Sequence, residues 1–138
     1  MELTRRQTLI VGLGAAAAAV LPLRASAAID EYVSAFTGGA DVGQGGITID
    51  APEIAENGNT VPIQVSAPGA VSIAVYAAGN PVPPVATFNF GPLAASQTAS
   101  TRIRLAKTQD VVAIAKMADG SFVQTSATVK VTIGGCGG

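Results

Sequence analysis

Apolar and polar residues alternate along most of the chain after residue 46, which is the pattern of half-buried β-strands. Seven segments share it, and their apolar members are Ile47 and Ile49; Val61, Ile63 and Val65; Val71, Ile73 and Val75; Ala86, Phe88 and Phe90; Ile103 and Leu105; Val112 and Ile114; and Val123, Ala127, Val129, Val131 and Ile133. Runs rich in glycine, proline, asparagine and aspartate separate the segments and indicate turns. The pattern therefore predicts an all-β fold, an immunoglobulin-like antiparallel β-sandwich of about seven strands over residues 46–133.

One helix is expected ahead of the sandwich, within a helix-and-linker segment of residues 28–45. Ile29, Tyr32, Val33 and Phe36 follow the i, i+3, i+4, i+7 spacing of an amphipathic helix, and Gly38-Gly39 provides its end. Because so short a helix is not stable alone, it must dock on something. The sequence leaves open whether that is its own domain or a second subunit.

Residues 1–27 have the features of an export signal. Arg5 and Arg6 precede an apolar run over residues 9–23, and small residues follow at 25–27, where a signal peptidase would cut. The run is shorter than the roughly 20 residues that span a bilayer as a helix, so we expect a cleaved leader rather than a retained anchor. The paired arginines resemble a twin-arginine signal, although Thr8 stands where Phe or Leu is usual. This predicts export to the periplasm.

Composition narrows the possible partners. The chain is 49% apolar and only 12% charged, and without residues 1–27 it keeps 9 − 1 = 8 acidic and 8 − 3 = 5 basic residues, a net charge of −3. The five cations are scattered along the sequence, so no basic stretch predicts nucleic acid binding. The scarcity of charge favours a partner protein that covers part of the surface.

Several kinds of chemistry are excluded by what the sequence lacks. With no histidine and one cysteine, the chain cannot build a Ser-His-Asp or Cys-His system, a dithiol couple, or a usual zinc, haem or iron–sulfur site. Carboxylate pairs do occur, at Asp30 with Glu31 and at Glu53 with Glu56. We interpret them as solvated or turn-forming residues. No catalytic residue, metal or cofactor is therefore expected.

Cys136 is the one group left with distinctive chemistry. It lies in the terminal segment Gly134-Gly135-Cys136-Gly137-Gly138, after the last predicted strand. Glycines have no side chain to pack and no strong conformational preference, so residues 134–138 are predicted to form a flexible arm. No cation is close in sequence, and at an ordinary thiol pKa only a few per cent would be ionised near pH 7. The pattern favours a thiol that carries cargo and is activated by other proteins.

The sequence also resembles the SoxY family of thiosulfate-oxidation sulfur carriers. The resemblance covers the whole chain, and its most specific part is the terminal Gly-Gly-Cys-Gly-Gly. Its other parts are the arginine-pair leader and the segments 52–58, 61–62, 80–81, 101–106, 108–109 and 129–133.

Membership would imply a periplasmic carrier rather than an enzyme. The resemblance implies a heterodimer with SoxZ and attachment of thiosulfate to Cys136 by the haem enzyme SoxAX. It further implies release of sulfate by SoxB and, in organisms that have it, oxidation of the remaining sulfur by SoxCD.

Three other interpretations fit parts of the same tail. A structural subunit could form an intermolecular disulfide through Cys136, and a carrier could also dimerise in this way. A ubiquitin-like carrier would end in Gly-Gly but would have a different fold and no leader. A prenylated tail needs its cysteine fourth from the end, whereas Cys136 is third.

Overall fold

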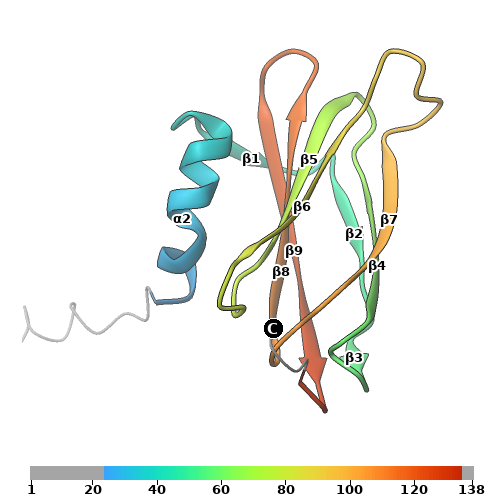
Figure 1. Ribbon diagram of the computed structural model, residues 1–138. Helices are drawn as coiled ribbons and strands as arrows, with labels where there is room; N and C mark the ends of the chain where they lie inside the picture. Colours follow the sequence, from blue (N-terminus) through green and yellow to red (C-terminus); the bar gives the residue numbers. More distant parts are fainter. Residues whose placement is uncertain (1–23, 135–138) are drawn as a thin grey trace, which may run out of the picture.

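The computed structural model describes residues 24–134, with side chains from residue 29 onward. Within that range one helix lies against a two-layered arrangement of strands (Figure 1). The elements are α2 (Arg24–Thr37), β1 (Val42–Gln44), β2 (Thr48–Asp50), β3 (Ile54–Ala55), β4 (Val61–Ser66), β5 (Ala70–Ala77), β6 (Pro84–Asn89), β7 (Thr98–Ile103), β8 (Gln109–Met117) and β9 (Phe122–Val131).

The strands form two sheets that face each other. The larger has the order β1-β9-β8-β5-β6, with β3 also paired to β9, and the smaller has the order β2-β4-β7. The prediction of an all-β sandwich with an N-terminal helix is confirmed. Residues 24–134 form nine strands rather than about seven, because β1 and β3 were not predicted. Both pair in parallel with β9, and two or three residues are too few to show an alternating pattern.

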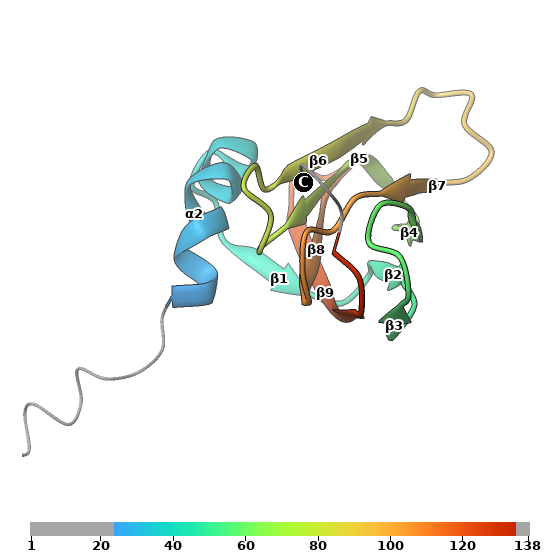
Figure 2. The same ribbon diagram turned by 60° about the horizontal axis from the view of Figure 1, so that its bottom comes forward.

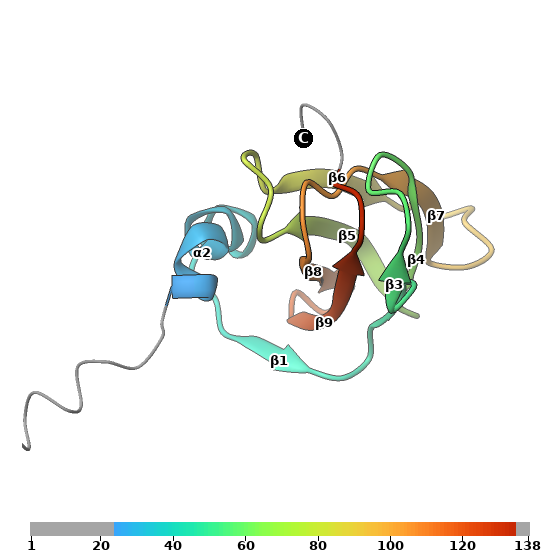
Figure 3. The same ribbon diagram turned by 90° about the horizontal axis from the view of Figure 1, so that it is seen from below.

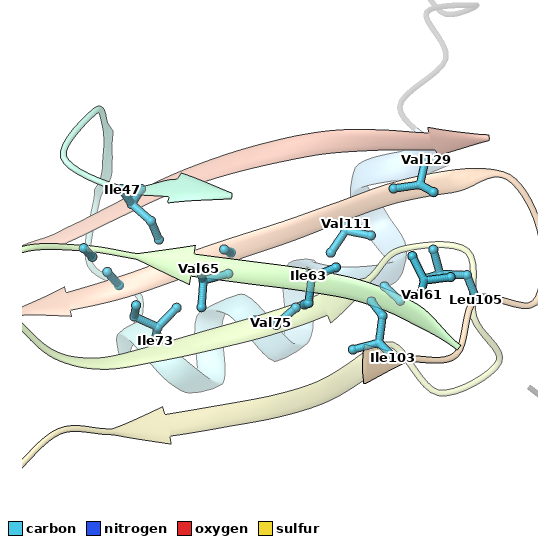
Figure 4. Close-up of a cluster of buried hydrophobic side chains, with 14 of the residues drawn as sticks. Ile47, Val61, Ile63, Val65, Ile73, Val75, Ile103, Leu105, Val111 and Val129 are labelled. Carbon is cyan, nitrogen blue, oxygen red and sulfur yellow. The ribbon is translucent and has the colours of Figure 1, made fainter. Parts of the chain in front are cut away.

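The main core fills the space between the two sheets (Figure 4). β4 shows the reason for the alternation, since Val61, Ile63 and Val65 are buried while Pro62 and Gln64 are exposed. Ile73 and Leu105 are fully buried against them. Burial of one such side chain contributes about 2 kcal/mol, so this core holds the sheets in a fixed relation.

A second core lies between α2 and the outer face of the larger sheet. Ile29 of the helix packs with Tyr76, Ile114 and Phe122 of the sheet. Phe36 meets Phe122 edge to face, with ring centroids 5.8 Å apart at 73°. Figure 2 shows the helix on this side, away from the smaller sheet. The helix therefore docks on its own domain, which resolves the alternative that the sequence left open.

The ends of the helix differ from the prediction by a few residues. It begins at Arg24 rather than at residue 28, and it ends at Thr37. Gly38 has a φ of 67° and the Gly39 amide donates to the Ser34 carbonyl at 3.2 Å, so a left-handed glycine closes the last turn. Over the part of the chain that the structure covers, no helix is long and apolar enough to cross a membrane.

Candidate functional site at the base of the C-terminal arm

Most residues of the predicted site fall beyond the described part of the chain. Gly135, Cys136, Gly137 and Gly138 lie outside it, as do the export-signal residues Arg5 and Arg6. Gly134 is the last described residue. What the structure defines is therefore the arm base, which we take as residues 130–134 together with the two segments that contact them, residues 53–58 and 104–109.

The first of these segments runs beside the end of β9. Residues 54–55 form β3, which pairs in parallel with residues 130–131. Beyond the strand, hydrogen bonds continue from Lys130 N to Glu53 O (2.9 Å), Thr132 N to Ala55 O (3.0 Å), Thr132 Oγ1 to Glu56 O (3.1 Å) and Gly58 N to Ile133 O (2.8 Å). The chain is thus held by residues 53–58 as far as Ile133.

The second segment is the loop between β7 and β8, which lies on the other side of the chain end. Figure 3 shows the end of the chain after β9 running between this loop and the loop that precedes β4. A Cβ added at Gly134 would overlap the carbonyl oxygen of Ala106 and lie 3.3 Å from its carbon. Position 134 therefore requires glycine for steric reasons, in addition to the flexibility predicted from the sequence.

Gly58 connects the two segments. Its amide donates to Ile133 O and its carbonyl accepts from Leu105 N, each at 2.8 Å. On the far side of the loop, the Thr108 hydroxyl oxygen accepts from the Val131 amide at 2.9 Å. Three stretches far apart in the sequence are thus joined around the arm base.

Two side-chain amides hold the loop itself. Asn80 donates from Nδ2 to Arg104 O (2.8 Å) and accepts at Oδ1 from Ala106 N (2.9 Å). Gln109, which is buried, donates from Nε2 to Asn80 Oδ1 (2.8 Å) and to Lys107 O (3.0 Å). Its Oε1 accepts from Gly79 N at 2.8 Å. These contacts satisfy loop backbone groups that have no sheet partner.

The fold brings cations to this end of the molecule that are distant from Cys136 in sequence. Arg104 and Lys107 are exposed on the loop, two residues and one residue from Ala106. The same end also carries Arg102, Lys130 and the carboxylates Glu53, Glu56 and Asp110, whereas Lys116 lies at the opposite end of β8. Cys136 has no cation close in sequence, yet Gly134, where its arm begins, lies against the loop that carries these two.

The two carboxylate pairs noted in the sequence lie in different places. Asp30 and Glu31 are exposed on α2, whereas Glu53 and Glu56 belong to the arm base, where their side chains are exposed and their backbone carbonyls accept hydrogen bonds. Among residues 24–134 no group of three or more His, Cys, Asp or Glu residues could hold a metal ion. The arrangement can present the arm, but its described side chains include no histidine to act as a base.

Two pKa shifts occur elsewhere in the domain. Hydrogen bonds from the Ser121 hydroxyl (2.6 Å) and amide (2.9 Å) lower the pKa of Asp119 in the β8–β9 turn. Burial under α2 raises the pKa of Tyr76. Neither residue lies at the arm base, so both shifts concern stability.

One protein family and several solved structures are similar to this chain. The family described as sulfur oxidation protein SoxY matches residues 33–136, a stretch that includes Cys136. The structure is similar to that of the sulfur carrier protein SoxY from Chlorobium limicola f thiosulfatophilum, with 34% identity, a TM-score of 0.70, and coverage of 78% of this chain and 94% of that one. No curated protein matches the sequence.

More distant structures share the fold alone. The superoxide reductase neelaredoxin from Ignicoccus hospitalis is 21% identical with a TM-score of 0.55, over 63% of this chain and 80% of that one. A reduced variant of neelaredoxin from Archaeoglobus fulgidus is 14% identical with a TM-score of 0.50, over 66% and 94%.

Proposed function

The chain belongs to the SoxY family of sulfur oxidation proteins, and we propose that it carries thiosulfate-derived sulfur covalently on Cys136 and presents it to the enzymes of the pathway. The observation that carries the proposal is the terminal Gly-Gly-Cys-Gly-Gly segment, which starts at a base held on both sides by hydrogen bonds and close packing. A fixed base with a short glycine-rich end suits a thiol that must enter the active sites of other proteins.

Loading of the carrier and release of sulfate require two chemical steps. The Cys136 thiol and thiosulfate lose two electrons and one proton, and a sulfur–sulfur bond forms to give the S-thiosulfonate; the electrons pass to a haem enzyme such as SoxAX. Water then attacks the terminal sulfonate sulfur, releasing sulfate and two protons and leaving a persulfide on Cys136. A SoxB-type hydrolase would catalyse that step, and a SoxCD-type dehydrogenase would oxidise the persulfide. The carrier supplies the thiol and no catalytic group.

The surface around the arm base supports anionic cargo. Arg104 and Lys107 are exposed on the loop against which Gly134 rests. Cys136 is two residues further on, within roughly 7 Å of extended chain. The positive charge of these two side chains would attract an anionic cargo, such as a sulfonate or a persulfide, and would favour the thiolate over the thiol.

Export and assembly complete the proposal. Residues 1–27 would be removed as a twin-arginine-type leader, so the carrier would act in the periplasm. The heterodimer partner would be SoxZ. The mature chain would then consist of the segment 28–45, the sandwich 46–133 and the arm 134–138.

Replacement of the thiol gives the direct test. Cys136→Ser should abolish thiosulfate-dependent sulfate formation in a reconstituted pathway and leave folding unchanged. The matched control adds Ser126→Cys to that variant, which restores one exposed cysteine in β9, away from the arm; it should not restore activity. Rescue by that thiol would refute the need for the arm. A wild-type protein that yields only disulfide dimer would favour a structural subunit.

A further inference from the structure

The loop that seats Gly134 has its conformation set by side chains. Residues 104–108 connect β7 to β8 and form no strand of their own. The carbonyls of Arg104 and Lys107 and the amide of Ala106 are bonded by the side-chain amides of Asn80 and Gln109. Because a primary amide can donate and accept at once, this pair holds the loop as an adjacent strand would.

The two amide side chains are closely packed, and each of their side-chain nitrogen and oxygen atoms has a hydrogen-bond partner. Gln109 is only 8% exposed, and a Cβ added at Gly79 would lie 2.9 Å from the Gln109 Cβ. Within the described residues no buried side-chain nitrogen or oxygen lacks a hydrogen-bond partner. The amides therefore occupy one defined arrangement, and removal of either leaves polar backbone groups of the loop without that partner.

We propose that Asn80 and Gln109 are positioning residues for the arm. They fix Ala106 as a seat for Gly134 and thereby set where the chain leaves the domain. The proposal rests on the carrier function of Cys136. Cys136 lies two residues from Gly134, at most about 7 Å away. A shift of the seat by even 1 Å is therefore a sizeable fraction of the reach, and misplacement on that scale slows an enzyme-catalysed step strongly.

A structural role alone makes a different prediction. If the amides only stabilise the domain, then a folded variant that lacks one of them should present Cys136 as well as the wild type does. Positioning instead predicts that the arm is displaced in a protein that is otherwise intact. The two roles separate when the arm is measured directly in folded protein.

The first measurement uses the full chain with nitroxides on Cys136 and on Lys116→Cys, an exposed position on β8. Lys116 is seven residues from Gln109 along β8, so this label lies about 24 Å along the strand from the Gln109 end. Gln109→Leu should shift or broaden the distance distribution found by pulsed electron resonance. The control Gln64→Leu removes an exposed side-chain amide on β4, whose oxygen accepts one hydrogen bond from the Ser100 hydroxyl of β7 (3.1 Å). This substitution should leave the distance distribution unchanged.

The second measurement concerns reactivity. With a thiosulfate-oxidising haem enzyme, Gln109→Leu should lower kcat for conjugation about tenfold, while the reaction of Cys136 with a small disulfide reagent stays within about twofold of wild type. Ile73→Val, a fully buried core change, controls for loss of stability. If Gln109→Leu does not fold, Asn80→Ala, at a half-buried position, replaces it.

The outcomes are distinct. Unchanged distances and an unchanged conjugation rate in the folded amide variant would overturn the positioning role. A tenfold effect in Ile73→Val as well would also overturn it, because stability would then explain the loss. A wild-type protein that no thiosulfate-oxidising enzyme conjugates would refute the carrier function, and the distance measurement would still decide whether the amides place the arm.

Discussion

Gly134→Ala tests whether the arm base is shaped by steric contact. The added methyl group would overlap the carbonyl oxygen of Ala106, and the carbonyl carbon would be only 3.3 Å away. Both partners are backbone atoms, so no side-chain rotation relieves the contact. Either the chain end or the loop must move by about 1 Å to reach an ordinary van der Waals distance.

The expected cost follows from the two ways of relieving the overlap. Movement of the loop strains the contacts of Asn80 and Gln109, and overpacking of this kind costs about 1–3 kcal/mol. Retreat of the chain end instead weakens the 2.8 Å hydrogen bond from Gly58 N to Ile133 O, worth about 1 kcal/mol. The less costly of the two movements sets the effect. We therefore expect the free energy of unfolding to fall by about 1 kcal/mol and Tm to fall by about 4 °C.

Thermal unfolding of the full chain, followed by circular dichroism, measures this directly. The matched control is Gly137→Ala, which makes the same chemical change beyond the arm base and should leave Tm unchanged. Amide hydrogen exchange at Gly58 and Leu105 should quicken in Gly134→Ala alone. A Gly134→Ala protein with wild-type Tm and wild-type exchange would refute the close packing of Gly134 against Ala106.

Three further predictions concern the rest of the molecule. Phe122→Ala should lower the free energy of unfolding in urea by about 3 kcal/mol and expose α2 to proteolysis, because it removes the contact with Phe36. The control Leu93→Ala should do neither, because the Leu93 side chain is 97% exposed. Ser121→Ala should raise the pKa of Asp119 toward its ordinary value in an NMR titration. Because the hydrogen bonds from Ser121 lower this pKa in the folded state, they stabilise the folded protein above about pH 4, and this stabilisation is lost as the pH falls through the folded-state pKa. At low salt, Arg104→Gln with Lys107→Gln should slow the reaction of Cys136 with an anionic disulfide reagent about fourfold more than its reaction with a neutral reagent, taking about twofold per charge at roughly 10 Å. Equal slowing of both reagents would contradict attraction of anionic cargo by these two residues.

The sequence predicted the sandwich because its signal is local. Alternation over Val61–Ser66 and the spacing of Ile29, Val33 and Phe36 depend only on which side of each element meets a core. β5 and β8 are instead buried on both faces, between α2 and the smaller sheet, so only part of their apolar run could be assigned to one face.

The arm base could not be predicted in the same way, because its contacts join residues far apart in the sequence. Gly134 meets Ala106, and Gly58 bonds to both Ile133 and Leu105. The only signal was the family resemblance, whose segments 52–58, 80–81, 101–106, 108–109 and 129–133 now prove to converge at this end of the sandwich. Their spacing gave no geometric reason to group them, so the seat of Gly134 and the two neighbouring cations were not foreseen.

The central claim is that Cys136 carries sulfur, and intact-mass spectrometry tests it most directly. Protein isolated from cells that are oxidising thiosulfate should show added sulfur or sulfonate mass on the peptide that contains Cys136, and a thiol reductant should remove it. Protein that shows only free thiol and disulfide-linked dimer under the same conditions would contradict the carrier function.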